Sequence, residues 1–247
     1  MSLVFVIGVS LVYLFQAMYP YLIYVVSNVL SPSIASVAVL LSAVALRKYW
    51  GNLQDKFSRI WLCFTLGMVF WFLGELIWAV YSLFLGVEIP YPSIADLLWL
   101  LGYVPLIIAL QLYIRVFRFA ISKTMYVATA VAVSIVAFIV FALLALPVLT
   151  EAQGTETVTL IIDLAYPALD LSLFSMSFRG LLIFLQGKIA KAWMLINAAI
   201  VMTSVADILF SFTTLQGTYY NGHLLELFYY MGYMFFALAF YTHRNEL

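Results

Sequence analysis

Long apolar runs separated by short polar stretches recur along the whole chain. Each run is near the ~20 residues that an α-helix needs to cross a hydrocarbon core of ~30 Å. The runs cover residues 3–26, 32–50, 60–85, 93–117, 125–149, 158–185, 193–215 and 222–242. This pattern predicts an all-α membrane protein with eight transmembrane helices, and it leaves no room for a soluble domain, so residues 1–247 are expected to form a single transmembrane domain.

The second predicted span is short, and its ends carry recognisable signals. Ser31 and Pro32 supply an N-cap and a first-turn proline. Arg47 and Lys48 can extend their charged ends toward water at the other end. We therefore expect a break between the first two spans just before Ser31.

Composition supports a membrane location. Hydrophobic residues make up 66% of the chain and charged residues 9%, against about 25% charged residues in an ordinary soluble domain. The mean hydropathy is +1.12. We expect a multi-pass protein of the cell membrane, with the lipid bilayer as its first partner. Zero net charge, with the bases confined to short loops, excludes nucleic acid as a partner.

The basic residues all fall on one side of the predicted topology. They occupy the loops between spans two and three, four and five, and six and seven, together with the flanking helix ends and the C-terminus. They are Arg47, Lys48, Lys56, Arg59, Arg115, Arg118, Lys123, Arg179, Lys188, Lys191 and Arg244. Because cytoplasmic loops carry the excess of Lys and Arg, both termini are predicted to be cytoplasmic.

The segment 61–115 recurs in degenerate form at 193–244. The matched positions are 132 residues apart before the outer turn and 130 apart after it. The two-residue difference falls in that turn, because a change of loop length costs little free energy. They are Trp61 with Trp193, Glu75 with Asp207, Asp96 with Glu226, Gly102 with Gly232, and Tyr103 with Tyr233. Four spans per repeat is an even number, so we expect two parallel four-helix repeats, about 1–120 and 121–247, related by an axis along the membrane normal.

Six carboxyl groups are predicted in the outer half of the membrane domain, where no Lys or Arg is expected. They belong to Glu75, Asp96, Asp163, Asp170, Asp207 and Glu226. An ionised carboxylate in hydrocarbon costs at least ~2.5 kcal/mol. These groups must therefore be protonated, hydrogen-bonded, solvated, or paired with a cation from outside the chain.

Aromatic residues accompany these acids. An acidic pocket with aromatic walls suits a small cation, either a hard metal such as Ca²⁺ or Mg²⁺ or an organic ammonium held by cation–π contacts. A divalent cation is the candidate cofactor, with Glu75, Asp170 and Asp207 as candidate metal ligands. The candidate ligand-binding residues are Glu75, Trp78, Asp96, Asp163, Tyr166, Asp170, Asp207 and Glu226.

Each acid also has a purely structural interpretation. Asp96 completes a capping box with Ser93, and Glu226 is favoured at a helix start by the macrodipole. A structural role is therefore favoured over ligand binding for both acids. At Asp163, which precedes Pro167 by four residues, structural and ligand roles are balanced. Glu75 and Asp207 lie in mid-span, where no capping role exists, so a functional role is favoured there.

Several short motifs resemble the multi-pass sensor regions that precede diguanylate cyclase and histidine kinase modules. The motifs are Gly74-Glu75-x-x-Trp78, Pro92-Ser93-x-Ala95-Asp96-x-x-Trp99-x-x-Gly102-Tyr103, Tyr166-Pro167-x-x-Asp170, Ala206-Asp207 with Glu226, and Tyr230-Met231-Gly232-Tyr233. The resemblance covers most of residues 61–243. It implies a membrane input domain that binds a ligand and acts on a separate cytoplasmic output protein.

A weaker resemblance is to the lysoplasmalogenase-like membrane hydrolases. Gly74-Glu75, Ser204-Val205-Ala206-Asp207 and Tyr229-Tyr230 look like the acidic motifs of that eight-span family, although Glu75 stands where Asp is expected and the spacing between Ser204 and Asp207 differs. The resemblance implies that Glu75 and Asp207 would be the catalytic pair activating water.

The sequence thus favours a ligand-binding or sensory module over an enzyme. In this interpretation an outward-facing acidic and aromatic pocket receives a cation or the head group of an amphiphile. Two alternatives stay open: a lysoplasmalogenase-like lipid hydrolase and a cation- or proton-coupled transporter.

Overall fold

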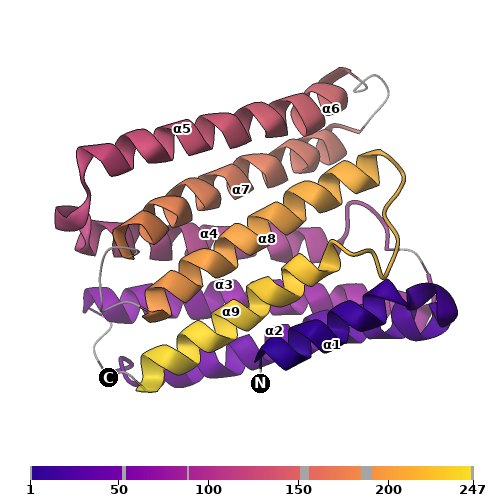
Figure 1. Cartoon of the computed structure of the whole chain (residues 1–247), viewed down its shortest axis with the longest axis horizontal. Helices are drawn as coiled ribbons and strands as arrows, with labels where there is room; N and C mark the ends of the chain where they lie inside the picture. The colour runs from indigo at the N-terminus through magenta and orange to yellow at the C-terminus, as the bar shows by residue number, and fades with distance from the viewer. Residues whose placement is uncertain (1, 52–53, 88, 151–155, 185–190, 246–247) are drawn as a thin grey trace.

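The regular structure of the chain is helical throughout the part described by the computed structural model, which comprises residues 2–51, 54–87, 89–150, 156–184 and 191–245 (Figure 1). The helices are α1 (Ser2–Leu14), α2 (Pro20–Arg47), α3 (Lys56–Ala79), α4 (Ile94–Val116), α5 (Lys123–Val140), α6 (Leu146–Thr150), α7 (Thr157–Phe184), α8 (Lys191–Leu215) and α9 (Glu226–Asn245). A π-helical segment, Val80–Leu85, extends α3, and another, Phe141–Ala145, joins α5 to α6.

Six helical segments are long and apolar enough to cross a membrane. They are Pro20–Arg47, Lys56–Leu85, Ile94–Val116, Lys123–Thr150, Thr157–Ile183 and Lys191–Leu215. The prediction of an all-α, multi-pass membrane protein is confirmed at this level. Of the remaining long helices, α9 has 20 residues and α1 has 13, which correspond to rises of ~30 Å and ~20 Å.

The predicted boundary between the first two spans is wrong. Ser31 and Pro32 lie inside α2, and the chain instead reverses before Pro20, which takes the first-turn position of that helix. Both prolines fit a helix start by local rules. Inside a membrane bundle, however, Pro32 is tolerated because neighbouring groups can satisfy the backbone that a proline leaves free.

The two ends of the bundle differ in charge. Helices α2, α4, α7 and α9 run toward one end, and α3, α5 and α8 run back (Figure 1). We call the first the basic end, because all described Lys and Arg residues lie in its loops or the adjoining helix turns. Lys188 lies outside the described residues. We call the opposite end, with the α3–α4 and α8–α9 connections, the acidic end.

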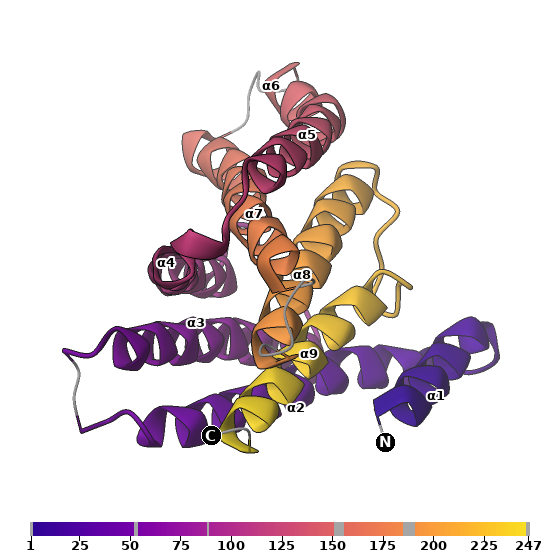
Figure 2. The same cartoon turned by 60° about the vertical axis from the view of Figure 1, so that its left-hand side comes forward.

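The core lies between α2, α3, α4, α8 and α9. Near the basic end the rings of Trp61 in α3 and Trp193 in α8 have centroids 5.4 Å apart, and His243 of α9 stacks on Trp61 at 4.0 Å. Helix α7 packs on α4 and α8 and carries α5 on its outer side (Figure 2). With α7 added to the five core helices, six helices pack together, while α5 forms the outer edge.

Candidate functional site

A cavity of ≈ 630 Å³ opens between the helices at the acidic end. Side chains from α2, α3, α4, α7, α8 and α9 line it, together with residues of the α3–α4 and α8–α9 connections. Of the predicted site residues, it includes Glu75, Trp78, Asp96, Asp163, Tyr166, Asp207 and Glu226. No Lys, Arg or His stands among the described residues that line it. The structure thus places these seven side chains around one space.

Glu75 lines this cavity from α3, four residues before Ala79, the last residue of that helix. Its Oε1 accepts a hydrogen bond of 2.9 Å from the hydroxyl of Tyr233 in α9, and Ser31 of α2 lines the same cavity. The preceding residue, Gly74, allows a close approach of α4, because a Cβ there would come 2.5 Å from Nε1 of Trp99. Glu75 is thus held by α9 beside an indole wall.

Asp207 and Asp170 meet at the base of the cavity. The Tyr103 hydroxyl lies 2.6 Å from Oδ1 of Asp170 and 3.1 Å from Oδ2 of Asp207, so this one hydroxyl bridges the two carboxyls. Tyr229 donates to Oδ1 of Asp207 at 2.6 Å. Asp170 is 2% exposed and does not line the cavity, so it supports Asp207 from behind.

Asp96 has the capping role that the sequence favoured. Its Oδ2 accepts from the backbone N–H of Ser93 at 2.7 Å and from the Ser93 hydroxyl at 2.8 Å, closing a capping box at the start of α4. The free oxygen, Oδ1, accepts from Tyr166 of α7 at 3.1 Å. The carboxyl therefore caps one helix and ties it to a second.

Glu226 stands at the first position of α9 and gathers four donors. Its Oε2 accepts from Tyr13 at 2.5 Å and from Tyr230 at 3.1 Å. Its Oε1 accepts from the backbone N–H of Gly222 at 2.7 Å and from Tyr219 at 3.2 Å. The structural interpretation of this acid is supported, because it joins α1, α9 and the connection before α9.

Asp163 accepts a hydrogen bond from Tyr91 of the α3–α4 connection. Burial and the neighbouring Asp163 carboxylate raise the pKa of the Tyr91 phenol. Tyr91 therefore keeps its proton and acts as a neutral donor. This contact closes the rim of the cavity between α7 and the loop that precedes α4.

Indoles form the apolar part of the wall. The rings of Trp78 and Trp99 have centroids 5.9 Å apart, and Phe210 of α8 packs edge-on to Trp78 at 6.2 Å. The Trp78 N–H is satisfied by Oδ1 of Asn28 in α2 at 3.1 Å. With its polar edge bound, Trp78 is oriented by α2 and contributes ring surface to the cavity.

Tyrosine is the partner that sequence reasoning missed. All six predicted carboxyls accept a hydrogen bond from at least one tyrosine hydroxyl. Tyr229 follows Glu226 by three residues in the chain but binds Asp207. Tyr103 and Tyr233 stood out in the sequence as matched repeat positions and as parts of the sensor-like motifs, but neither signal predicted which acid each would bind. Tyrosine hydroxyls are neutral donors, so among the described residues no side chain of the cavity supplies a positive charge.

The candidate metal ligands come together only in part. Asp170 and Asp207 share the Tyr103 hydroxyl, while Glu75 is held separately by Tyr233 of α9. Within the described segments, no group of three His, Cys, Asp or Glu side chains has the arrangement needed to hold a metal ion. The acids are therefore spread around a cavity instead of converging on one point.

Comparisons of the chain with protein-family models, with curated proteins and with solved structures found no match. The site is consequently interpreted from its own geometry.

Proposed function

We propose that the protein is an integral membrane binding or sensory module whose acidic-end cavity receives an organic ammonium group, either a small molecule or the head group of an amphiphile. One observation carries the proposal. Five carboxyls line a cavity of ≈ 630 Å³ that contains no cationic side chain among its described residues. A cation from outside the chain is the missing counter-charge for such a group of acids.

The cavity favours an organic cation over a bare metal ion. A hard cation needs six to eight oxygen ligands within about 2.6 Å, but these carboxyls are spaced around the wall and engaged by tyrosines. The paired rings of Trp78 and Trp99 offer the faces that attract alkylammonium groups. The volume is also within the ~300–1,000 Å³ typical of small-molecule pockets.

We further propose that the domain consists of two parallel four-helix repeats with eight spans, oriented with the basic end and both termini in the cytoplasm. Contacts across the halves support the repeat. Tyr103 of the first half binds Asp207 of the second, and Tyr233 of the second binds Glu75 of the first. Tyr103 and Tyr233 are matched positions of the repeat, and so are Glu75 and Asp207. Each half therefore donates the same kind of hydrogen bond to the other, as a two-fold axis requires.

The matched glycines support the same relation. A Cβ at Gly102 would come 3.2 Å from the carbonyl of Gly67, and one at Gly232 would come 3.4 Å from the carbonyl of Ala199. Gly67 and Ala199 are separated by the same interval as Trp61 and Trp193. The close approach of α3 to α4 is thus repeated between α8 and α9.

A change in helix packing caused by ligand binding at the acidic end would reach the basic end through three helices. Helices α3, α8 and α9 carry cavity residues at the acidic end and core aromatic residues near the basic end. In agreement with the resemblance to membrane sensor regions, we propose that a ligand biases the packing of these helices and that a cytoplasmic output protein reads the change.

Thermal unfolding of the purified protein in a maltoside detergent tests the proposal. Choline, tetramethylammonium and a phosphocholine amphiphile are expected to raise the unfolding midpoint, and Ca²⁺ and Mg²⁺ are not. Glu75→Gln and Asp207→Asn should abolish the shift. Glu156→Gln, at an exposed position of the same end, should retain it. Equal shifts in all variants, or none with any ammonium compound, would contradict the cavity assignment.

The buried acid pair favours a second function, cation- or proton-coupled transport. Asp170 and Asp207 both lie against the Tyr103 hydroxyl. Two carboxylates this close repel each other unless one carries a proton, and Asp207 borders the cavity. A ligand arriving there could exchange for that proton. Uptake of labelled choline into proteoliposomes, driven by an imposed pH gradient and lost in Asp170→Asn, would favour transport over sensing.

A further inference from the structure

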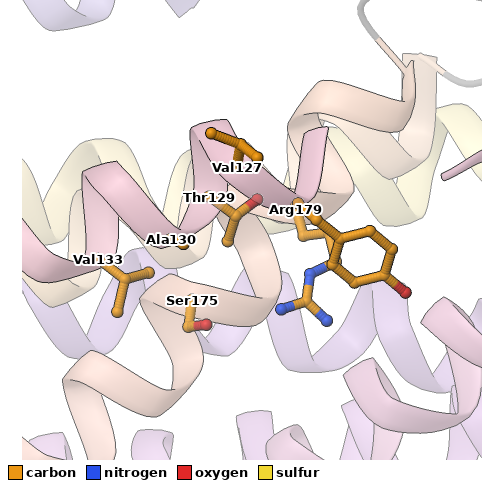
Figure 3. Close-up of a pocket in the computed structure, with 7 residues that line it drawn as sticks. Val127, Thr129, Ala130, Val133, Ser175 and Arg179 are labelled. Carbon is orange, nitrogen blue, oxygen red and sulfur yellow. The ribbon is translucent and has the colours of Figure 1, made fainter. Parts of the chain in front are cut away.

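A second cavity lies between α5 and α7, toward the basic end. It has a volume of ≈ 430 Å³, and Figure 3 shows its lining, with Val127, Thr129, Ala130 and Val133 on one helix and Ser175 and Arg179 on the other. It shares no lining residue with the acidic-end cavity. A role for this second cavity therefore does not depend on the function proposed for the acidic-end cavity.

Arg179 is the unusual member of this cavity. Its guanidinium carbon lies 5.2 Å from the centre of the Tyr126 ring, a cation–π contact. Its Nε is buried and has no hydrogen-bond partner, and no carboxylate of the described residues forms an ion pair with it. The Ser175 hydroxyl beside it lines the same cavity. The site thus offers an unused donor, Nε of Arg179, beside one hydroxyl and one positive charge.

The depth of Arg179 indicates which anion it meets. It precedes Phe184, the last residue of α7, by five positions, which is ~7.5 Å along the helix axis. A charged residue at this depth is costly unless it is paired or reaches the interface. The phosphate groups of the leaflet at the basic end are the negative charges nearest to this level.

The remaining walls suit a lipid tail. Val127 is 61% exposed on α5, and Ala130 is also exposed. The 18-residue window of the α5–α6 segment is only 11% buried inside the protein, because α5 packs mainly on α7. The groove is therefore reached sideways from the bilayer, which is where an acyl chain would lie.

We propose that this groove binds an anionic phospholipid of the leaflet at the basic end. Arg179 and Ser175 donate to the phosphate oxygens, and the Tyr126 ring holds the guanidinium in place. One acyl chain lies along Val127, Ala130 and Val133. The occupied site fills the gap between α5 and α7 and joins the outer helix to the bundle.

The test is lipid binding by the whole protein in a maltoside detergent. Phosphatidylglycerol is titrated against phosphatidylcholine, and retained lipid is counted by native mass spectrometry. Wild-type protein should retain phosphatidylglycerol in preference, and Arg179→Gln should bind it about tenfold more weakly. Lys191→Gln, which removes an exposed base at the same end, should bind it as the wild type does.

A second variant separates lipid binding from a folding defect. Ala130→Phe leaves Arg179 intact but fills the groove, and it should lose the retained lipid while its unfolding midpoint without lipid stays near that of the wild type. Equal retention of phosphatidylglycerol by wild type, Arg179→Gln and Ala130→Phe, or equal retention of both lipids by the wild type, would overturn the proposal.

Discussion

Tyr233 in α9 donates its hydroxyl to Glu75 in α3 at 2.9 Å, a contact that joins residues 158 positions apart in the chain. Tyr233 is 3% exposed, so its hydroxyl donates from a buried position on the cavity wall. Tyr233→Phe is therefore expected to lower the free energy of unfolding by about 1–3 kcal/mol and to weaken ammonium binding at the acidic-end cavity.

Thermal unfolding in detergent, with and without choline, measures both effects. Tyr241→Phe is the matched control, because Tyr241 is 52% exposed on the same helix. If the two variants unfold at the same temperature and bind choline equally, the Tyr233–Glu75 contact has no energetic role.

The pair Asp170 and Asp207 predicts different outcomes for two substitutions of one residue. Asn at position 170 can accept from Tyr103 and donate to Asp207 without an added proton, so Asp170→Asn should leave stability unchanged or raise it. Asp170→Leu removes both contacts in a site that is 2% exposed, and it should cost about 1–3 kcal/mol. Unfolding midpoints of the two variants and the wild type provide the measurement. A midpoint for Asp170→Asn below that of Asp170→Leu would show that the adjacency of the carboxyls does not matter.

Glu226 is predicted to anchor α1. Tyr13, which is fully buried, reaches Glu226 at 2.5 Å, and α1 has few other neighbours besides α9 and the turn that follows it. Glu226→Ala should raise amide hydrogen exchange in α1 by about tenfold or more, since a lost charge-assisted bond is worth about 1.5–3 kcal/mol. Exchange in α5, which does not contact this region, serves as the internal control. Unchanged exchange in α1 would assign its docking to apolar packing alone.

The orientation of the bundle can be tested with single cysteines. Cys63 is the only cysteine of the chain, so Cys63→Ala provides a background without thiols. Gly51→Cys marks the basic end, at an exposed site where a Cβ meets nothing within 4 Å, and Gln216→Cys marks the acidic end at an exposed site. In intact cells a membrane-impermeant maleimide should label position 216 and spare position 51 until the membrane is permeabilised. The reverse labelling would place the acidic cavity on the cytoplasmic side.

Local sequence patterns predicted where a helix begins when the segment contained only one possible start signal. The start of α4 at Ser93, with its capping box to Asp96, agrees with the predicted span, because the donor and acceptor lie three residues apart. The start of α2 was mistaken because Pro20 and Pro32 satisfy the same local rule. Only packing against the neighbouring helices distinguishes a proline that begins a helix from one that is tolerated inside it.

The amino-acid sequence by itself determined the helical membrane class, the gathering of bases at one end and the presence of acids toward the other. These properties depend on how each residue interacts with lipid, water and its near neighbours along the helix. The tertiary structure alone decided that Tyr103 bridges Asp170 and Asp207, that Tyr13 reaches Glu226, and that a cavity remains between these acids. Such contacts join helices that are distant in the chain, and their partners depend on how those helices pack against one another.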